Sequence, residues 1–130
     1  SVIFKRASDV VEADFKTSDG IIAGSPTYFG NMSAELKDMF DRFVGLRRQG
    51  GMEGKIGAAF ATSGHPTGGK ETTMMAIIQA FLIYGMIVVG DPISAGGHYG
   101  VACQGSPSQK DLDDAKRLGI RVGELAKKLR

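Results

Sequence analysis

A short apolar run that ends in a glycine- and proline-containing turn most constrains how this chain can fold. The run Gly20–Ala23 leads into the turn Gly24–Asn31, and an amphipathic segment over 32–43 begins directly after it. This pattern predicts a buried strand over 20–24, a turn and a helix. In an open parallel sheet, ligands bind in the crevice at such a strand-to-helix transition. The turn offers backbone N–H groups, a Thr hydroxyl and two aromatic rings, which suit a flat heterocycle with polar edges better than a bare phosphate.

The same alternation of strand and helix continues along the whole chain. We predict further strands over 2–4, 55–62 and 86–89, helices over 10–15 and 70–84, a last helix capped by Ser108, and loops around Gly45–Gly54 and over 91–105. Apolar residues at helical spacing predict the buried positions of two helices: Met32, Leu36, Met39, Phe40 and Phe43 in one, and Leu112, Ala115, Leu118, Val122, Leu125, Ala126 and Leu129 in the last. The order predicts a single α/β domain over 1–130, a doubly wound parallel sheet between two helical layers.

Composition narrows the class of protein. The net charge of +2 and the scattered basic pairs give no basic stripe of the kind that binds nucleic acid. Because Cys103 is the only cysteine, an internal disulfide is excluded, and a reducing cytoplasm is the expected location. The segment 72–90 carries no charge, but Gln79, Gly85 and its β-branched end favour a buried helix, a turn and a strand over a membrane span.

A second glycine-rich turn resembles a nucleotide-binding loop without completing it. Residues 64–70 match the first seven positions of a Walker A motif and stand between a predicted strand and a predicted helix. The eighth position, which should be Ser or Thr for magnesium, is Glu71, whose carboxylate would repel phosphates. Pro66 also removes one backbone donor. These departures disfavour a nucleotide hydrolase.

Several segments together resemble the flavodoxin-like FMN proteins, and in particular the WrbA-type NAD(P)H:quinone oxidoreductases. The segments are Gly24–Ser33, Thr62–Gly64 with Gly68–Thr72, Tyr84–Gly90, Gly96–Val101 and Pro107–Leu112, so the likeness covers nearly the whole chain. Gly24–Ser33 is the most specific of them. The resemblance implies a flavodoxin-like three-layer α/β/α fold and an FMN-binding oxidoreductase that takes electrons from NAD(P)H and passes them to quinones or similar acceptors.

The resemblance also implies which residues hold the cofactor and how the chain assembles. It assigns the wall of the flavin site to Pro26, Thr27, Tyr28, Phe29, Gly30, Asn31, Thr62, Ser63, Gly64, Gly68 and Gly69, and it brings Tyr84 near the flavin of a neighbouring subunit. The expected assembly is a homodimer or a homotetramer. No acid–base pair is needed for hydride transfer, so neither a catalytic residue nor a metal ligand is assigned.

Plainer interpretations of single residues remain open beside this one. Tyr28 and Phe29 could be turn aromatics that pack on the helix, and Asn31 is expected to cap that helix. His65 and His98 are expected to be loop residues. Cys103 has no activating neighbour in the sequence.

One part of the family pattern is not found in these residues. Flavodoxin-like proteins open with a strand and a Ser/Thr- and Gly-containing loop that grips the FMN phosphate, whereas residues 2–9 are followed by no glycine before Gly20. The resemblance therefore predicts that a strand–loop–helix unit of roughly 30–40 residues precedes Ser1. Two other functions stay open: a non-enzymatic electron carrier of the flavodoxin type, and a flavin-free scaffold of the same fold. The expected partner is a small-molecule electron acceptor or a redox partner protein. The mildly basic charge and the lack of Trp favour the reductase over the carrier.

Overall fold

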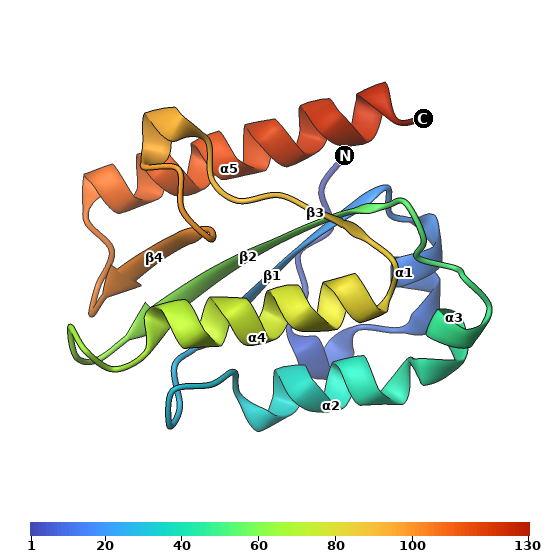
Figure 1. The fold of residues 1–130 in the computed structure, drawn as a ribbon, viewed down its shortest axis with the longest axis horizontal. Coiled ribbons are helices and arrows are strands. Elements are labelled where there is room, and N and C mark those ends of the chain that lie inside the picture. Colours follow the sequence, from blue (N-terminus) through green and yellow to red (C-terminus); the bar gives the residue numbers. More distant parts are fainter.

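The computed structural model describes all 130 residues and contains a single four-stranded parallel sheet flanked by helices (Figure 1). Its strands are β1 (Gly20–Pro26), β2 (Ile56–Ser63), β3 (Ile87–Val88) and β4 (Val101–Gln104). Its helices are α1 (Glu12–Thr17), α2 (Ala34–Arg42), α3 (Val44–Arg48), α4 (Lys70–Ile83) and α5 (Gln109–Lys128), with 3-10 turns at Ala7–Asp9 and Ile93–Ala95.

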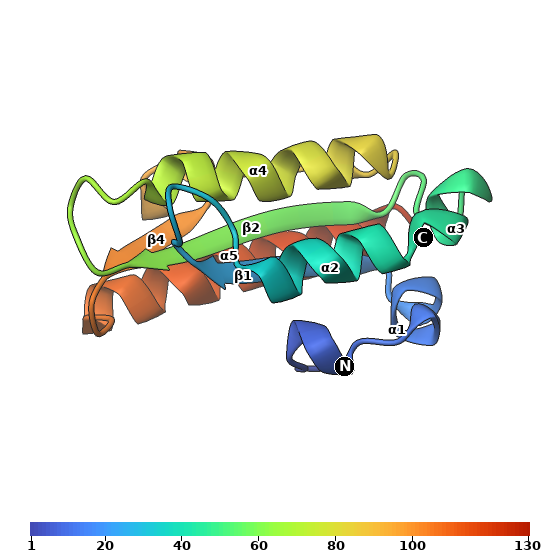
Figure 2. The same ribbon diagram turned by 90° about the horizontal axis from the view of Figure 1, so that it is seen from below.

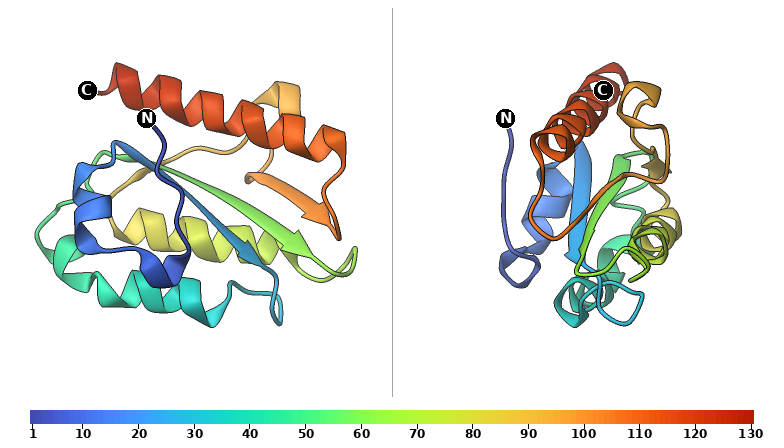
Figure 3. Two further views of the ribbon diagram at one scale, coloured as in Figure 1. Left: turned by 180° about the vertical axis from the view of Figure 1, so that it is seen from behind. Right: turned by 90° about the vertical axis from the view of Figure 1, so that its left-hand side faces the viewer.

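Strand β2 is the centre of the sheet. It pairs along one edge with β1, in a register from Gly20 opposite Ile56 to Pro26 opposite Thr62. Its other edge pairs with β3 near its start and with β4 near its end. Helices α2 and α4 cover one face of the sheet and α5 covers the other (Figures 2 and 3). The predicted doubly wound α/β architecture is confirmed.

Small residues on β2 allow the helices to approach the sheet closely. Ala59 and Ala61 belong to the core beneath α2 and α4, whereas Ile56 and Ala58 pack against α5. A Cβ added to Gly57 would lie 2.9 Å from the ring of Phe81, so this position has no room for a side chain. Helix α4 buries Thr73, Met74, Ile77, Ile78 and Phe81, and every predicted core residue of the segment 32–43 is buried.

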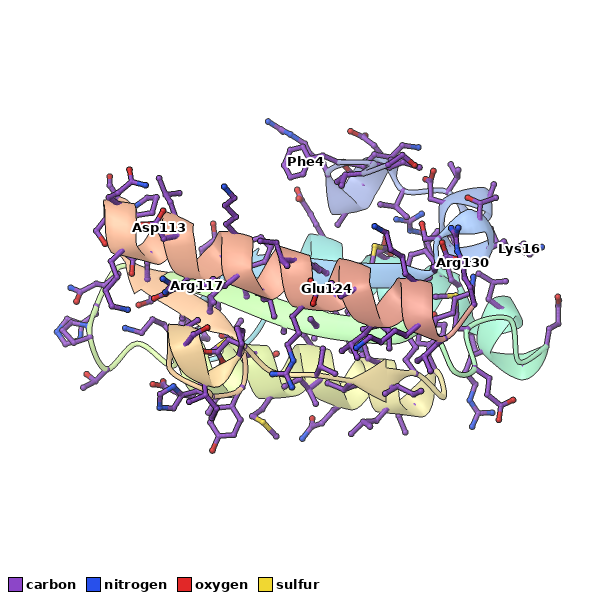
Figure 4. All side chains as sticks on the ribbon, turned by 90° about the horizontal axis from the view of Figure 1, so that it is seen from above. Phe4, Lys16, Asp113, Arg117, Glu124 and Arg130 are labelled. Carbon is purple, nitrogen blue, oxygen red and sulfur yellow. The ribbon has the colours of Figure 1, made fainter.

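The N-terminal prediction of a strand over 2–4 is wrong. These residues form no strand, and the Phe4 side chain is almost fully exposed (Figure 4). The outer edge of β1 therefore pairs with no strand among the 130 residues. The predicted helix over 10–15 is replaced by the 3-10 turn and by α1, which begins two residues later.

Two predicted loops contain short regular elements. Helix α3 includes Gly45, and its Leu46 side chain is fully buried. The segment 91–105 holds a 3-10 turn and strand β4. Strand β4 extends the sheet by pairing with residues Phe60–Ser63 of β2. Both elements are too short to leave a hydrophobic period in the sequence. Conversely, the predicted strand over 86–89 is reduced to two residues.

The last helix begins as predicted but buries fewer residues. Ser108 caps it: its Oγ accepts a hydrogen bond from the Asp111 N–H, and the Asp111 carboxylate accepts one from the Ser108 N–H at 2.8 Å. Leu118 and Val122 are buried, but the expected core residues Leu112, Ala115 and Leu129 are exposed. Leu112 and Ala115 line the hollow beside β4, and Leu129 follows the last residue of the helix, so none of them enters the closed core.

The polar side of α5 carries charged side chains such as Asp113, Arg117 and Glu124 (Figure 4). At its end, Arg130 pairs with Asp19, the residue before β1. No helix combines the length and the apolar character needed to cross a membrane. The uncharged segment 72–90 is instead divided among α4, a turn at Gly85 and β3.

We expect the aromatic contact between α2 and α4 to dominate the core. The Phe81 and Phe40 rings meet edge to face with their centroids 5.5 Å apart, and Phe81 has no exposed surface. Phe81→Ala should lower the free energy of unfolding by about 3–5 kcal/mol in urea denaturation, because it opens a cavity. Leu82→Ala, next to it but 57% exposed, should cost less than about 1 kcal/mol. Equal losses in the two variants would contradict this account.

Candidate functional site

Two turns meet at the carboxyl edge of the sheet because β1 and β2 run parallel and in register. The first turn comprises residues 26–31 and follows β1, and the second comprises residues 63–69 and follows β2. The ladder extends past β1 through the Thr27 N–H, which donates to the Thr62 carbonyl at 2.7 Å. A Cβ added to Gly69 would lie 2.8 Å from the Gly30 Cα, so the two backbones touch there.

The first turn is tightly closed and presents its aromatic rings outward. Tyr28 and Asn31 exchange two backbone hydrogen bonds of 2.9 and 3.0 Å, and both residues between them adopt left-handed conformations, Phe29 with φ 51° and Gly30 with φ 73°. Phe29 is fully exposed and Tyr28 is 59% exposed. The interpretation of Phe29 as a packed turn aromatic is therefore wrong. A strained, exposed aromatic is a feature typical of functional sites.

Serine residues, and not Asn31, connect the first turn to α2. Ser33 is the N-cap, since its side chain accepts from the Leu36 N–H. The Asn31 side chain accepts only from the adjacent Met32 N–H, so the prediction that it caps the helix is wrong. The buried Ser25 accepts from the Ser33 N–H at 2.8 Å and thus fixes the start of α2 against β1.

The second turn is shaped by its own side chains. Ser63 Oγ donates to the His65 carbonyl at 2.8 Å, and the Gly68 N–H donates to the same carbonyl at 3.1 Å. His65 Nδ1 accepts from the Thr67 N–H, which is a loop contact as expected. Gly69, with φ 102°, is the last residue of the turn and the N-cap of α4.

Both turns present backbone donors that no group of the protein accepts. The N–H groups of Phe29 and Gly30 in the first turn, and of Gly64 and Gly69 in the second, have no protein acceptor. They line the edge at which the turns meet. Such donors are able to bind the electronegative edge of a heterocycle or an anionic group.

Two threonines at the start of α4 join the turns, and the sequence did not reveal this role. Thr72 Oγ lies 2.6 Å from the Gly30 carbonyl and 2.9 Å from the Gly69 carbonyl. The buried Thr73 Oγ lies 2.9 Å from the Gly69 carbonyl and 3.2 Å from Thr27 Oγ. Their position just after a glycine turn is the only signal in the sequence, and it does not specify what the hydroxyls contact.

Five of the predicted site residues border two different hollows. A groove of about 1180 Å³ between α2, α3 and α4 is lined by Tyr28, Phe29, Asn31 and Tyr84. A smaller hollow of about 450 Å³ beside β4 is lined by Thr62. Its other lining residues include Lys70, Tyr99, Cys103, Lys110, Asp111 and Asp114.

Tyr84 lies far from the turns of its own chain. It follows α4, which separates it from Gly69 by about 21 Å along the helix axis. Its hydroxyl donates to the Phe40 carbonyl at 2.6 Å, and burial raises the pKa of Tyr84 to about 12, with a further contribution from Asp41. The hydroxyl is therefore neutral and held in the core. An approach of Tyr84 to a neighbouring subunit's flavin stays a prediction.

The smaller hollow holds Cys103 beside a set of paired charges. Burial raises the pKa of the Cys103 thiol, and Asp111 raises it further, so the thiol is protonated at neutral pH. His98 belongs to a loop: its N–H donates to the buried Asp91 carboxylate at 2.7 Å. Asp114, buried in α5, pairs with Lys110 and with Arg117. No cluster of side chains suited to a metal ion is present.

Comparisons with known proteins identify the family of the chain. The family model described as NADPH-dependent FMN reductase matches residues 6–100. The chain belongs to this family. It is 44% identical over 116 residues to an NAD(P)H dehydrogenase (quinone) from Archaeoglobus fulgidus, covering 85% of the chain and 61% of that protein. It is 41% identical to an iron-sulfur flavoprotein from Methanocaldococcus jannaschii, covering 92% of the chain and 64% of the relative.

Solved structures identify the fold. A flavodoxin, WrbA-like protein from Agrobacterium tumefaciens superimposes with a TM-score of 0.82 at 25% identity, over 91% of this chain and 72% of that one. The fold is thus flavodoxin-like. The chain spans about three fifths of the length of the Archaeoglobus relative.

Acid should weaken the fold through Asp114. The hydrogen bond from Lys110 and the charge of Arg117 hold the pKa of Asp114 below its usual value. Because the native pKa is lower than the unfolded value of about 3.9, the ionised pair stabilises the fold fully above that pH, and this stabilisation is lost as the pH falls through the native pKa.

Asp114→Asn should therefore lower the melting temperature at pH 7. Between pH 5 and roughly pH 2, the melting temperature of this variant should fall less than that of the wild type. Asp113→Asn, on the exposed side of the same turn, is the matched control and should leave the pH profile unchanged. Parallel melting-temperature profiles for the wild type and Asp114→Asn would show that this pair does not contribute.

Proposed function

We propose that the chain belongs to an FMN-dependent oxidoreductase that uses NAD(P)H to reduce quinones or similar small acceptors by two-electron transfer. The observation that carries the proposal is the meeting of two turns with free N–H donors and an exposed aromatic at one edge of a flavodoxin-like sheet. The quinone dehydrogenase names of the relatives support the reaction class.

The residues present fit the ring of a flavin. Its pyrimidine edge carries carbonyl and ring-nitrogen acceptors, which match the free N–H groups of Phe29, Gly30, Gly64 and Gly69. At Gly69 a Cβ would meet the Gly30 Cα, so the glycine lets the two turns touch and keeps their N–H groups at one edge of the sheet. When bound, FMN supplies the hydride chemistry.

In this proposal the protein binds and orients the ring and stabilises charge. The first turn, Pro26–Asn31, lies along one side of the ring, and Thr62, Ser63, Gly64, Gly68 and Gly69 approach it from the other. Backbone N–H groups of both turns would stabilise negative charge that develops on the pyrimidine edge. Exposed Phe29 and Tyr28 would cover apolar surface and exclude water. No side chain of the chain is required to transfer a proton.

Two alternatives differ in what they predict. An electron carrier of the same fold would bind FMN but would need a separate reductase, and a flavin-free scaffold would bind no FMN.

The presence of a single, free Cys103 supports the reducing cytoplasm as the location in which any of these would work.

The proposed function is tested by FMN titration and by NADPH-dependent quinone reduction with the full-length gene product. We expect FMN binding and turnover without an added reductase. Gly69→Ala should weaken FMN binding about tenfold or more, because its Cβ would meet the Gly30 Cα and its φ of 102° strains any L-residue. The control is Gly123→Ala in α5, where a Cβ meets no atom within 4 Å. Wild-type protein that binds no FMN would leave only the scaffold.

We also propose that the groove between α2, α3 and α4 pairs with a second copy of the chain, giving a homodimer or a homotetramer. Phe29, Val44 and Ile83 are exposed apolar residues along this groove, and Arg47 and Asp41 offer charges of both signs that a two-fold pairing would bring together. Because Tyr84 lines the same groove, such a pairing is the arrangement in which it would come near a partner's site.

Ile83→Lys should raise the dissociation constant of the assembly at least about tenfold, because it places a charge in the buried apolar contact. Light scattering after size-exclusion chromatography would measure the change. Ile120→Lys, at an exposed position on α5 away from the groove, is the control and should leave the mass unchanged. A monomeric wild type would refute the pairing.

A further inference from the structure

We propose that Thr72 is a positioning residue: its hydroxyl holds the tip of the first turn against the second turn and so preorganises the wall of the site. The effect on flavin binding rests on the proposed function, whereas the contact between Thr72 and the first turn does not. Thr72 lies in the first turn of α4, and its Oγ is 2.6 Å from the Gly30 carbonyl.

This is the only hydrogen bond that joins the tip to a more distant part of the protein, beside the close approach of the Gly30 and Gly69 backbones. The β1–β2 ladder ends at the Thr27 N–H, and Tyr28 and Asn31 then bond only to each other. The Asn31 side chain bonds only the neighbouring Met32 N–H. Among residues 28–31, the Gly30 carbonyl alone forms a hydrogen bond with a residue outside 25–33, and its partner is Thr72.

Packing does not replace that hydrogen bond. The Phe29 ring is fully exposed, and Tyr28 is more than half exposed. The left-handed φ of Phe29, which is not a glycine, adds strain that a free loop would relieve by changing conformation. A hydroxyl that bonds Gly30 therefore limits the number of conformations open to the tip. Fewer conformations in the free protein mean less ordering when a ligand binds.

Thr73 holds the base of the same turn. Its buried hydroxyl lies within hydrogen-bond distance of the Gly69 carbonyl and of Thr27 Oγ. The adjacent pair thus joins the turns at two points, the tip through Thr72 and the base through Thr73. Thr72 is the better residue to change because it is exposed, so the loss of its hydroxyl leaves the core intact.

The contact is tested first without any flavin, by residue-resolved amide hydrogen exchange. Thr72→Val keeps the shape and removes the hydroxyl, and it should make the Tyr28 and Asn31 amides exchange about fivefold faster with little change in melting temperature. Thr72→Ser should restore the wild-type rates. Thr17→Val is the matched control, since exposed Thr17 Oγ donates to the Ala13 carbonyl at 2.8 Å far from the site.

The consequence for the site is tested by FMN titration of the same variants in the full-length gene product. Thr72→Val should weaken FMN binding about fivefold, and Thr72→Ser and Thr17→Val should bind as the wild type does. Unchanged exchange at Tyr28 and Asn31 in Thr72→Val, or faster exchange with unchanged FMN affinity, would overturn the positioning role. A wild type that binds no FMN would refute the proposed function instead, while the exchange rates would still decide whether Thr72 holds the tip.

Discussion

The parallel pairing of β1 with β2 is the constraint on which the rest of the structure depends. Seven consecutive residue pairs, from Gly20 with Ile56 to Pro26 with Thr62, fix how far each strand reaches. Because the strands end at the same level, their two turns are brought side by side at one edge of the sheet. A shift of one residue would turn Ala23 from the core to the opposite face and would separate Gly30 from Gly69.

Helix α4 packs close to the sheet because the residues of β2 beneath it are small. Gly57, Ala59 and Ala61 leave room for the large side chains of α4, and Phe81 takes the space above Gly57. Helix α4 therefore lies close enough to the sheet for its first turn to reach the loops. Thr72 and Thr73 reach the turns because Phe81 and its neighbours set the depth of α4 about two and a half helical turns away.

Sequence pattern was sufficient where a segment buries one continuous face. The stripe of α2 was predicted from its helical spacing, and strands β1 and β2 and helix α4 were predicted because their apolar runs end next to glycines. The pattern was insufficient where pairing with a distant strand decides whether a segment forms a strand. Val2–Phe4 is apolar enough for a strand but pairs with nothing here, whereas β4 exists only because β2 offers it an edge. Likewise, Leu112 and Leu129 fit the period of α5 but are exposed: Leu112 lines the hollow beside β4, and Leu129 follows the last residue of the helix.

The site shows the same division. That the turns after 20–24 and 55–62 lie together follows from parallel strands and could be predicted. The hydrogen-bond partner of each hydroxyl could not be predicted, because Thr72 and Thr73 look equivalent in the sequence although Thr72 is exposed and Thr73 is buried. The helical rotation of about 100° between them decides this, and it sends one hydroxyl to the tip and the other to the base of the same turn. The wall beside Gly30 is therefore set by the orientation of α4 as much as by the turn that forms it.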